Sequence, residues 1–175
     1  MPKFISTAEF SDDRLYRYSL TRVINPGPTW PANPRPLAIC GLNPSDANEI
    51  KDDPTITREI DFARRWDCDI LIKVNAYAWV ETKPKLMFAE KRKNSRDIVG
   101  PDNDAHIKRA IEECKAANGI FLVAWGKHIE PYRQMVLADL IGDIATCLQT
   151  NLDGTPTHPL YLPATLVPVP WKLAA

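Results

Sequence analysis

The sequence predicts an α/β fold, a three-layer α/β/α sandwich around a central, mainly parallel sheet of four strands. Short apolar runs alternate along the chain with segments of helical periodicity, which is typical of right-handed βαβ units. The chain has 175 residues, enough for one domain with a buried core, and no repeat or long linker divides it. Its 45% hydrophobic and 25% charged residues are ordinary for a globular protein.

Four short apolar runs are the expected strands of this sheet, at residues 37–40, 70–74, 120–124 and, more weakly, 146–148. Continuous apolar runs suit strands that are buried on both faces. In residues 16–24, large apolar and aromatic side chains alternate with mostly polar ones, which predicts a half-buried antiparallel strand at one edge. We therefore expect an N-terminal strand and proline-rich loop over residues 1–36, and a core with a proline-rich tail over 37–175.

Three helices are expected between these strands. The first should cover residues 55–66, with Asp53 as its N-cap, because Pro54 follows at the first helical position. The second should begin after Gly100-Pro101-Asp102 and end at Gly119, and the third should cover residues 131–141. Residues 83–96 carry six Lys or Arg and one Glu, which is typical of a solvated loop.

Charge and cysteine content narrow the function classes. The formal net charge is +0 and the pI is about 6.8, which argues against a protein that coats DNA. No apolar run approaches the roughly 18 residues of a membrane span, so we expect no membrane partner. The cysteines show no metal-ligand spacing and lie in or beside apolar stretches, which predicts buried free thiols, a cytoplasmic location and no metal: Cys40, Cys68, Cys114 and Cys147.

Polar or unusual residues follow each expected core strand. Asn43 follows the first strand, Asn75 ends the second, Trp125-Gly126 ends the third and His158 lies beyond the fourth. Parallel strands place their carboxyl ends at one rim, where ligands bind in open α/β sheets. The sequence therefore predicts a site for a small ligand, a nucleobase or nucleotide, at this rim.

Each of these residues also has a purely structural interpretation. Asn43 before Pro44 is a common turn, and Asn75 could tie two loops together. Trp125 with Gly126 could be core packing and a turn, and His158 could be a buried, satisfied histidine. Dinucleotide-binding, P-loop, α/β-hydrolase and zincin motifs are all absent, so those enzyme classes are poor interpretations.

The order of motifs along the chain resembles the uracil-DNA glycosylase superfamily. These motifs are Gly-Leu-Asn-Pro-Ser at 41–45, Val-Asn-Ala at 74–76, Trp-Gly at 125–126 and His-Pro-Leu at 158–160. From Pro36 onward the chain also resembles an uncharacterised prokaryotic and viral family, a domain of unknown function. Its pattern is L-N-P-S, D-D-P-T, G-P-D-N, W-G and H-P-L-Y.

The glycosylase resemblance implies a role for each motif residue. Asn43 would position the attacking water, Asn75 would read the base edge, and His158 would stabilise negative charge on the departing base. Leu160 and Tyr161 would fill the gap left by a flipped nucleotide. The motifs at 41–45 and 125–126 would add the substrate-binding residues Gly41, Pro44, Ser45, Trp125 and Gly126. We also expect Asp53, which follows in the chain, to bind substrate.

Three function hypotheses follow. The leading one is a nucleobase-recognising enzyme, without a cofactor, that cleaves an N-glycosidic bond of a modified or deaminated base in nucleic acid or nucleotide. The second is a non-catalytic module that binds a base, a nucleotide or a protein, and the third is a metal-dependent hydrolase or transferase that uses Asp52 and Asp53. A nucleic-acid backbone could contact the basic segment through Lys83, Lys85, Lys91, Arg92, Lys93 and Arg96.

Overall fold

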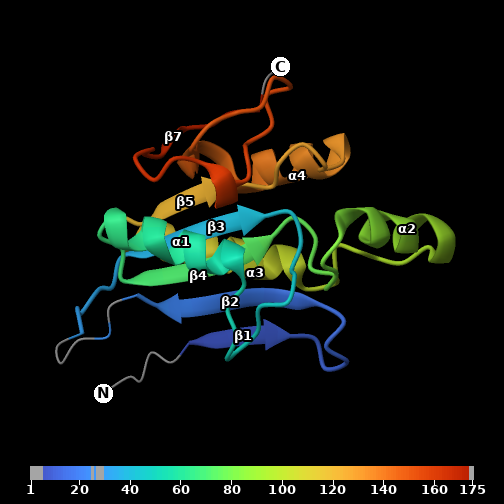
Figure 1. Ribbon diagram of the computed structural model, residues 1–175, viewed down its shortest axis with the longest axis horizontal. Coiled ribbons are helices and arrows are strands. Elements are labelled where there is room, and N and C mark those ends of the chain that lie inside the picture. Colours follow the sequence, from blue (N-terminus) through green and yellow to red (C-terminus); the bar gives the residue numbers. More distant parts are fainter. Residues whose placement is uncertain (1–5, 25, 27–29, 174–175) are drawn as a thin grey trace.

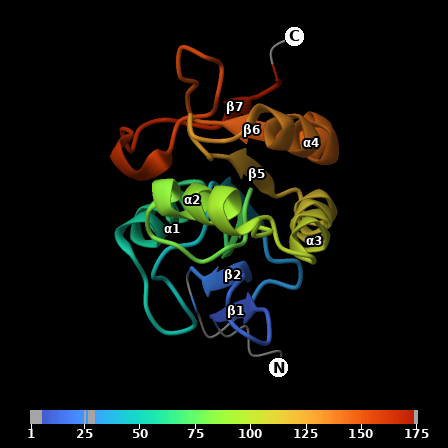
Figure 2. The same ribbon diagram turned by 90° about the vertical axis from the view of Figure 1, so that its right-hand side faces the viewer.

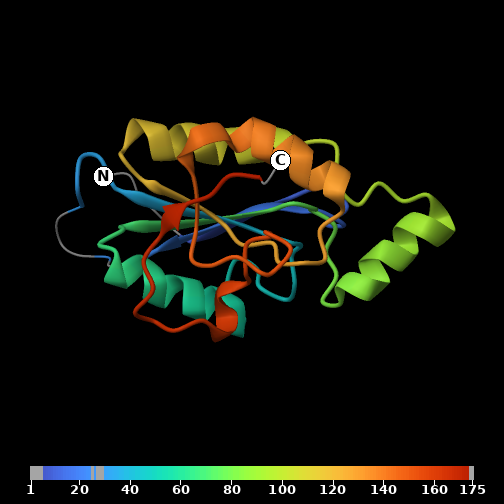
Figure 3. The same cartoon turned by 90° about the horizontal axis from the view of Figure 1, so that it is seen from above.

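The computed structural model describes residues 6–24, 26 and 30–173 (Figure 1). It confirms the α/β class: helices cover both faces of one mixed sheet, with α1 on one side and α3 and α4 on the other (Figure 3). The proline-rich segment before the first core strand is described only in part, and Pro28 lies outside the described residues. No helix in the described ranges combines the length and the apolar character that a membrane crossing requires.

The sheet is larger than predicted, with seven strands in the described part of the chain. Their order across the sheet is β1-β2-β4-β3-β5-β6-β7. Strands β4, β3, β5 and β6 run parallel to their neighbours in this series, whereas β1, β2 and β7 add antiparallel pairings. The bounds are β1 Thr7–Phe10, β2 Arg17–Val23, β3 Pro36–Gly41, β4 Ile70–Asn75, β5 Ile120–Val123, β6 Ala145–Cys147 and β7 Val169–Pro170.

The predicted place of the N-terminal strand at the edge was wrong. Strand β2 lies between β1 and β4, so both of its edges are paired. The four residues of β1 are too few to show a clear alternation in the sequence. Strand β7 has two residues, one of which is a proline, and proline is tolerated in a sheet mainly at edges like this one.

Four α-helices and two short 3₁₀ turns complete the described elements. Their bounds are α1 Pro54–Arg65, α2 Pro84–Asn94, α3 Asn103–Ala116, α4 Pro131–Ile141, η1 Gly142–Ile144 and η2 Pro159–Tyr161. The N-cap of α1 is as predicted, because Asp53 Oδ1 accepts the backbone N–H of Ile56 over 2.8 Å.

The interpretation of residues 83–96 as a loop was wrong. Most of this segment forms α2, which begins at Pro84 and projects beyond the sheet (Figures 1 and 2). Its buried anchor is Met87, which is 0% exposed, while the basic side chains face solvent. A helix with one buried residue has little apolar periodicity, so its pattern in the sequence is weak.

Alternation along the central strands separates two cores. On β3, Leu37 and Ile39 pack into the core beneath α1, which also contains Phe62. Their neighbours Ala38 and Cys40 belong to the larger core beneath α3 and α4. Because successive side chains of a strand point to opposite faces, one apolar run supplies both cores. All four cysteines are free and buried, as predicted.

Candidate functional site

A pocket of about 500 Å³ opens beyond the carboxyl ends of β3, β4 and β5. Its volume is within the range of small-molecule sites. The structure brings nine of the predicted site residues to its wall, whereas Pro44 and Leu160 do not line it. The nine are Gly41, Asn43, Ser45, Asp53, Asn75, Trp125, Gly126, His158 and Tyr161.

The amide of Asn43 is held in one orientation. Its Nδ2 donates to the backbone carbonyls of Pro44, over 3.1 Å, and of Glu81. Because both partners are acceptors, the nitrogen must face them and Oδ1 must be the other atom of the amide. Oδ1 makes no hydrogen bond to any described residue, so it is available as an acceptor for a water molecule or a ligand N–H.

Asn75 is the most unusual polar residue of the pocket. It ends β4, is 1% exposed and lines the cavity. Neither Oδ1 nor Nδ2 has a hydrogen-bond partner within the described ranges. A buried amide without partners costs free energy unless a ligand or water satisfies it. The side chain therefore offers a donor, Nδ2, and an acceptor, Oδ1, to a ligand in the pocket.

His158 reaches the pocket from the start of η2. Its Nδ1 accepts the backbone N–H of Leu160 over 3.3 Å, which leaves the proton of the neutral ring on Nε2. Burial lowers the pKa of His158 to about 4, and the nearby Lys73 adds to this effect while Asp53 opposes it. The imidazole is therefore neutral at physiological pH and can act as a hydrogen-bond donor through Nε2.

Comparison with known proteins identifies one matching family. A family model described as "Protein of unknown function (DUF1643)" matches residues 17–160. The chain belongs to this family. The match starts at β2 and ends in η2, so it includes Asn43, Asn75 and His158 of the DUF1643 domain. No curated protein and no solved structure matches the chain.

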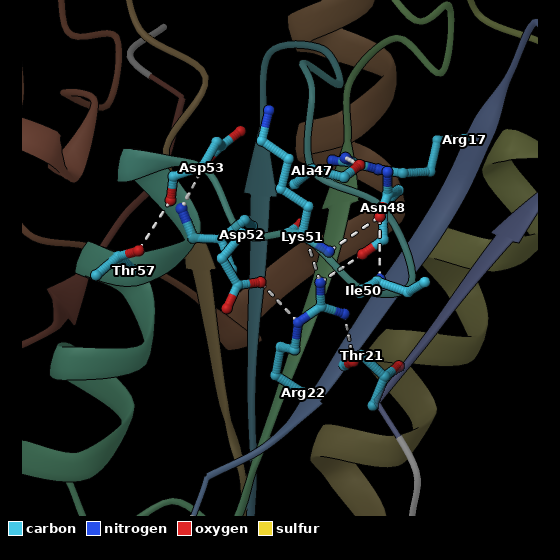
Figure 4. Close-up of polar contacts among 11 residues, drawn as sticks. Arg17, Thr21, Arg22, Ala47, Asn48, Ile50, Lys51, Asp52, Asp53 and Thr57 are labelled. Carbon is cyan, nitrogen blue, oxygen red and sulfur yellow. Dashed lines mark hydrogen bonds and ion pairs between the residues drawn. The ribbon is translucent and has the colours of Figure 1, made fainter.

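Asp52 and Asp53 of the DUF1643 domain are adjacent in sequence but have different partners. Asp52 pairs with Arg22 Nε over 2.8 Å (Figure 4). Asp53 instead caps α1 and accepts the hydroxyl of Ser45. Both carboxylates thus have charge-compensating or capping contacts that a shared metal would have to replace. In the described ranges no group of three or more His, Cys, Asp or Glu could hold a metal ion.

Trp125 and Gly126 form the wall of the pocket next to β5. The indole of Trp125 is 1% exposed, donates to Gln134 Oε1 over 3.3 Å and packs edge-on against Trp171. Gly126 has a φ of +71°, a conformation that favours glycine, and its N–H donates to the carbonyl of Pro156 over 2.9 Å. This bond ties the wall to the segment that carries His158.

The two residues predicted to fill the gap left by a flipped nucleotide differ in exposure and in their relation to the pocket. Tyr161 is 92% exposed at the mouth of the pocket, as a residue that contacts a macromolecular ligand must be. Leu160 is partly buried and does not line the pocket. Leu162, the residue after Tyr161, is fixed by its carbonyl, which accepts a hydrogen bond from Arg58 of α1.

Three buried charged residues of the pocket region, Arg17, Lys73 and Glu59, are absent from the sequence-based prediction. Lys73 and Arg17 both line the cavity although they are 4% and 2% exposed, and Lys73 pairs with the fully buried Glu59. The signals were a lysine inside an otherwise apolar strand and a glutamate on the apolar face of α1, three residues after Ile56. Buried Lys and Glu are rare unless paired, so each of them predicts a partner.

Basic residues of α2 lie beside the mouth of the pocket. A second hollow, lined in part by Lys83, Lys85 and Arg92, shares Thr82, Pro84 and His128 with the main pocket. Lys91 is engaged with Glu130 over 2.7 Å, and the guanidinium of Arg96 stacks on Trp79. The remaining basic side chains of α2 are exposed and have no ion-pair partner in the described part of the chain.

Proposed function

We propose that this protein binds a nucleobase in the pocket and cleaves its N-glycosidic bond, the base being a modified or deaminated one in nucleic acid or a nucleotide. The observation that carries this proposal is the buried Asn75, whose amide has no partner among the described residues and lines the cavity. The edge of a nucleobase presents adjacent donors and acceptors that match an amide.

Asn43 supplies the second part of the proposed reaction. Its Nδ2 is occupied by two backbone carbonyls, so Oδ1 accepts from a water molecule and directs the water oxygen at C1′ of the sugar. The C1′–N bond breaks with its electron pair going to the base, while the water oxygen adds to C1′ and its proton is released through solvent to neutralise the base anion. Charge builds up on the sugar and the base in an oxocarbenium-like transition state.

His158 supplies the third part. Its neutral ring carries a proton on Nε2, which donates a hydrogen bond to the departing base as negative charge develops there. A fixed dipole of this kind stabilises a transition state more than a ground state, because the charge appears only during the reaction. A neutral donor also avoids the cost of a buried cation before the substrate is bound.

The order of motifs supports the same chemistry. Asn43 follows β3, Asn75 ends β4 and His158 lies beyond β6, and all three line one pocket. This is the order of the corresponding motifs in the uracil-DNA glycosylase superfamily. We therefore propose a fold related to that superfamily for this DUF1643 domain.

Nucleic acid is the favoured carrier of the base. The second hollow, beside α2, places Lys83, Lys85 and Arg92 next to the mouth of the pocket, where a phosphate backbone would pass. Tyr161 at the mouth offers an exposed aromatic ring that can stack on a neighbouring base. The neutral net charge of the chain limits this attraction to the local patch.

The test is base release from a mixed panel. The purified protein is incubated with DNA and RNA oligomers that carry deaminated or modified bases, and with free nucleosides and nucleotides, and mass spectrometry detects released base. Release that is lost in Asn43→Ala and in His158→Ala, with both variants folded, would support the proposal. Saturable binding without release would instead indicate a non-catalytic binding module on the same pocket.

A further inference from the structure

The floor of the pocket contains a buried ion pair. Lys73 Nζ donates to Glu59 Oε1 over 2.5 Å, and the two side chains are 5% and 0% exposed. Lys73 lines the cavity, whereas Glu59 does not. The pair therefore presents its ammonium end to the pocket and keeps its carboxylate behind. Glu59 accepts one of the three N–H bonds of the ammonium, which leaves the others for a ligand.

Lys73 lies deeper in the pocket than Asn75. Both belong to β4 and are two residues apart, so their side chains share one face of the sheet, and Lys73 is further from the carboxyl end of the strand. The two side chains meet above Gly41 of the neighbouring strand. A Cβ at Gly41 would stand 2.7 Å from Lys73 Nζ and 3.0 Å from Asn75 Oδ1, so a side chain there would displace the Lys73 ammonium from its present position.

Arg17 is a second buried cation at the cavity. Its Nη1 donates to the carbonyl of Ala47, but its buried Nε has no hydrogen-bond partner among the residues described. Burial lowers the pKa of Arg17 to about 10, so the guanidinium remains charged at neutral pH. A charged, buried and partly unsatisfied donor that lines a cavity indicates a ligand group with acceptor atoms.

Two acidic residues line the pocket, Asp53 and Glu81, and both are engaged: Glu81 Oε1 accepts the backbone N–H of Lys83 over 3.1 Å. Asp53 Oδ1 accepts the N–H of Ile56, and Oδ2 accepts the hydroxyl of Ser45. Two buried acceptor oxygens, Asn75 Oδ1 and Glu59 Oε2, also have no partner among the described residues, but Glu59 does not line the cavity. The charged groups with free hydrogen-bonding capacity that face the cavity are therefore the donors Lys73 and Arg17. A ligand that enters this far must present oxygen acceptors to them, and a negative charge would be stabilised most.

From this arrangement we propose that the pocket selects a base whose deepest edge carries an anionic oxygen substituent such as a carboxylate, with Lys73 as the specificity-determining residue. This inference rests on the proposed nucleobase pocket and deepens it by naming a substrate class. The carboxylate would accept charge-assisted hydrogen bonds from the ammonium of Lys73 while Asn75 holds the ring edge. A cationic substituent at the same position would meet two like charges.

The test compares three free bases that differ in charge at one position: uracil, 5-carboxyuracil and 5-aminomethyluracil. Calorimetric titration at pH 7 gives the dissociation constant of each. We expect 5-carboxyuracil to bind at least about tenfold more tightly than uracil, which is the gain that one charge-assisted hydrogen bond allows. We expect 5-aminomethyluracil to bind most weakly of the three.

The variant for this test removes both partners, Lys73→Met with Glu59→Leu, so that no unpaired charge stays buried. We expect it to fold, to bind uracil and to lose the preference for the carboxylate. The control is Lys127→Met, which removes an equal charge from an exposed residue at the mouth of the same pocket and should keep the preference. A merely structural ion pair would change stability but not the ratio of the two dissociation constants.

The outcomes separate this inference from the proposed function. Binding of uracil without a preference for 5-carboxyuracil would overturn the inference and leave the nucleobase pocket standing. An unchanged preference in the double variant would also overturn it, because the charge would then be read elsewhere. If the wild-type protein bound none of the three bases, the nucleobase pocket itself would be refuted, and this inference with it.

Discussion

His158 Nδ1 accepts a hydrogen bond from the backbone N–H of Leu160 over 3.3 Å, two residues further along the chain. This contact closes the start of η2 and at the same time assigns the proton of the neutral ring to Nε2. One local hydrogen bond thus links the shape of the C-terminal segment to the chemistry of the pocket.

The first prediction concerns the protonation of His158. Burial and the ammonium of Lys73 lower its pKa to about 4, so its ring resonances should titrate near that pH and not near the ordinary value of 6.5. Because Lys73 contributes to the shift, Lys73→Met with Glu59→Leu should raise the midpoint. NMR titration of the labelled histidine measures both values. A midpoint near 6.5 in the wild-type protein would contradict the buried, neutral ring.

The same shift gives stability a defined pH dependence. Between pH 6.5 and about pH 4 the unfolded chain binds a proton at His158 that the folded chain does not bind. The free energy of unfolding should therefore decline as the pH falls through this window, with no further loss from this group below it. Urea denaturation at pH 7 and pH 5 measures the decline, and His158→Gln should make it smaller.

The second prediction compares two buried asparagines. The side-chain amide of Asn75 has no hydrogen-bond partner in the described part of the chain, whereas Asn103 Nδ2 donates to the backbone carbonyls of Asn75 and Ala76 over 3.0 and 3.3 Å. Asn75→Leu should leave the free energy of unfolding unchanged or raise it by about 1 kcal/mol while ligand binding is lost. Asn103→Leu should lower it by about 2 kcal/mol.

Thermal and urea denaturation of both variants provide the measurement, with base binding as the second readout. The asparagines are matched in residue type and burial, and Oδ1 of each has no partner among the described residues, so the difference between them isolates the contribution of the Nδ2 hydrogen bonds. A large loss of stability in Asn75→Leu would show that this amide has a structural partner and would remove the main support for a ligand at the floor.

The third prediction concerns the loop that follows Asn43. Arg22 of β2 is buried and holds this loop through Asp52 Oδ1, over 2.8 Å, and the carbonyl of Asn48, over 2.5 Å (Figure 4). Arg22→Met should lower the free energy of unfolding by about 2 kcal/mol, because it removes the hydrogen bonds of a buried guanidinium to Asp52 and to the part-buried carbonyl of Asn48. Ligand binding should weaken too, since the loop ends at Asp53 on the pocket wall.

A matched control is Arg64→Met on α1. Arg64 pairs with Asp61 over 3.5 Å, but both side chains are about half exposed, at 54% and 49%. Exposed pairs contribute little, so this variant should change the free energy of unfolding by less than about 0.5 kcal/mol. Equal effects of the two substitutions on stability would contradict the bracing role of Arg22.

Much of the architecture could be predicted from local signals. The four core strands are apolar runs, and Asp53 with Pro54 marks the start of α1, because caps and strand burial depend on neighbouring residues. The convergence of Asn43, Asn75 and His158 followed from one topological rule, that parallel strands end at the same rim. None of these inferences required knowledge of side-chain packing.

The missing elements depend on contacts between distant segments. Lys73 and Glu59 form a pair between β4 and α1, and neither residue identifies its partner from its own surroundings in the sequence. The strand β1 is defined by its pairing with β2, and α2 is fixed through Met87 and the Lys91–Glu130 pair. Tertiary context overrides weak local patterns in such segments.

The last prediction tests nucleic acid at α2. Lys85 and Arg92 are exposed beside the mouth of the pocket, and Lys108 and Lys115 are exposed on α3, on a different part of the surface. If a phosphate backbone lies along α2, Lys85→Gln with Arg92→Gln should weaken oligonucleotide binding across sequences. The slope of log K against log salt should become shallower by about 1 per lost contact.

The control Lys108→Gln with Lys115→Gln removes the same charge and should leave both the affinity and the salt slope unchanged. Fluorescence anisotropy over a range of salt concentrations measures the two variants under identical conditions. Equal losses in both would mean that net charge, and not the position of α2, governs the attraction. Unchanged binding in the α2 variant, with base release intact, would instead favour a free nucleoside or nucleotide as the substrate, because a small ligand needs no contact outside the pocket.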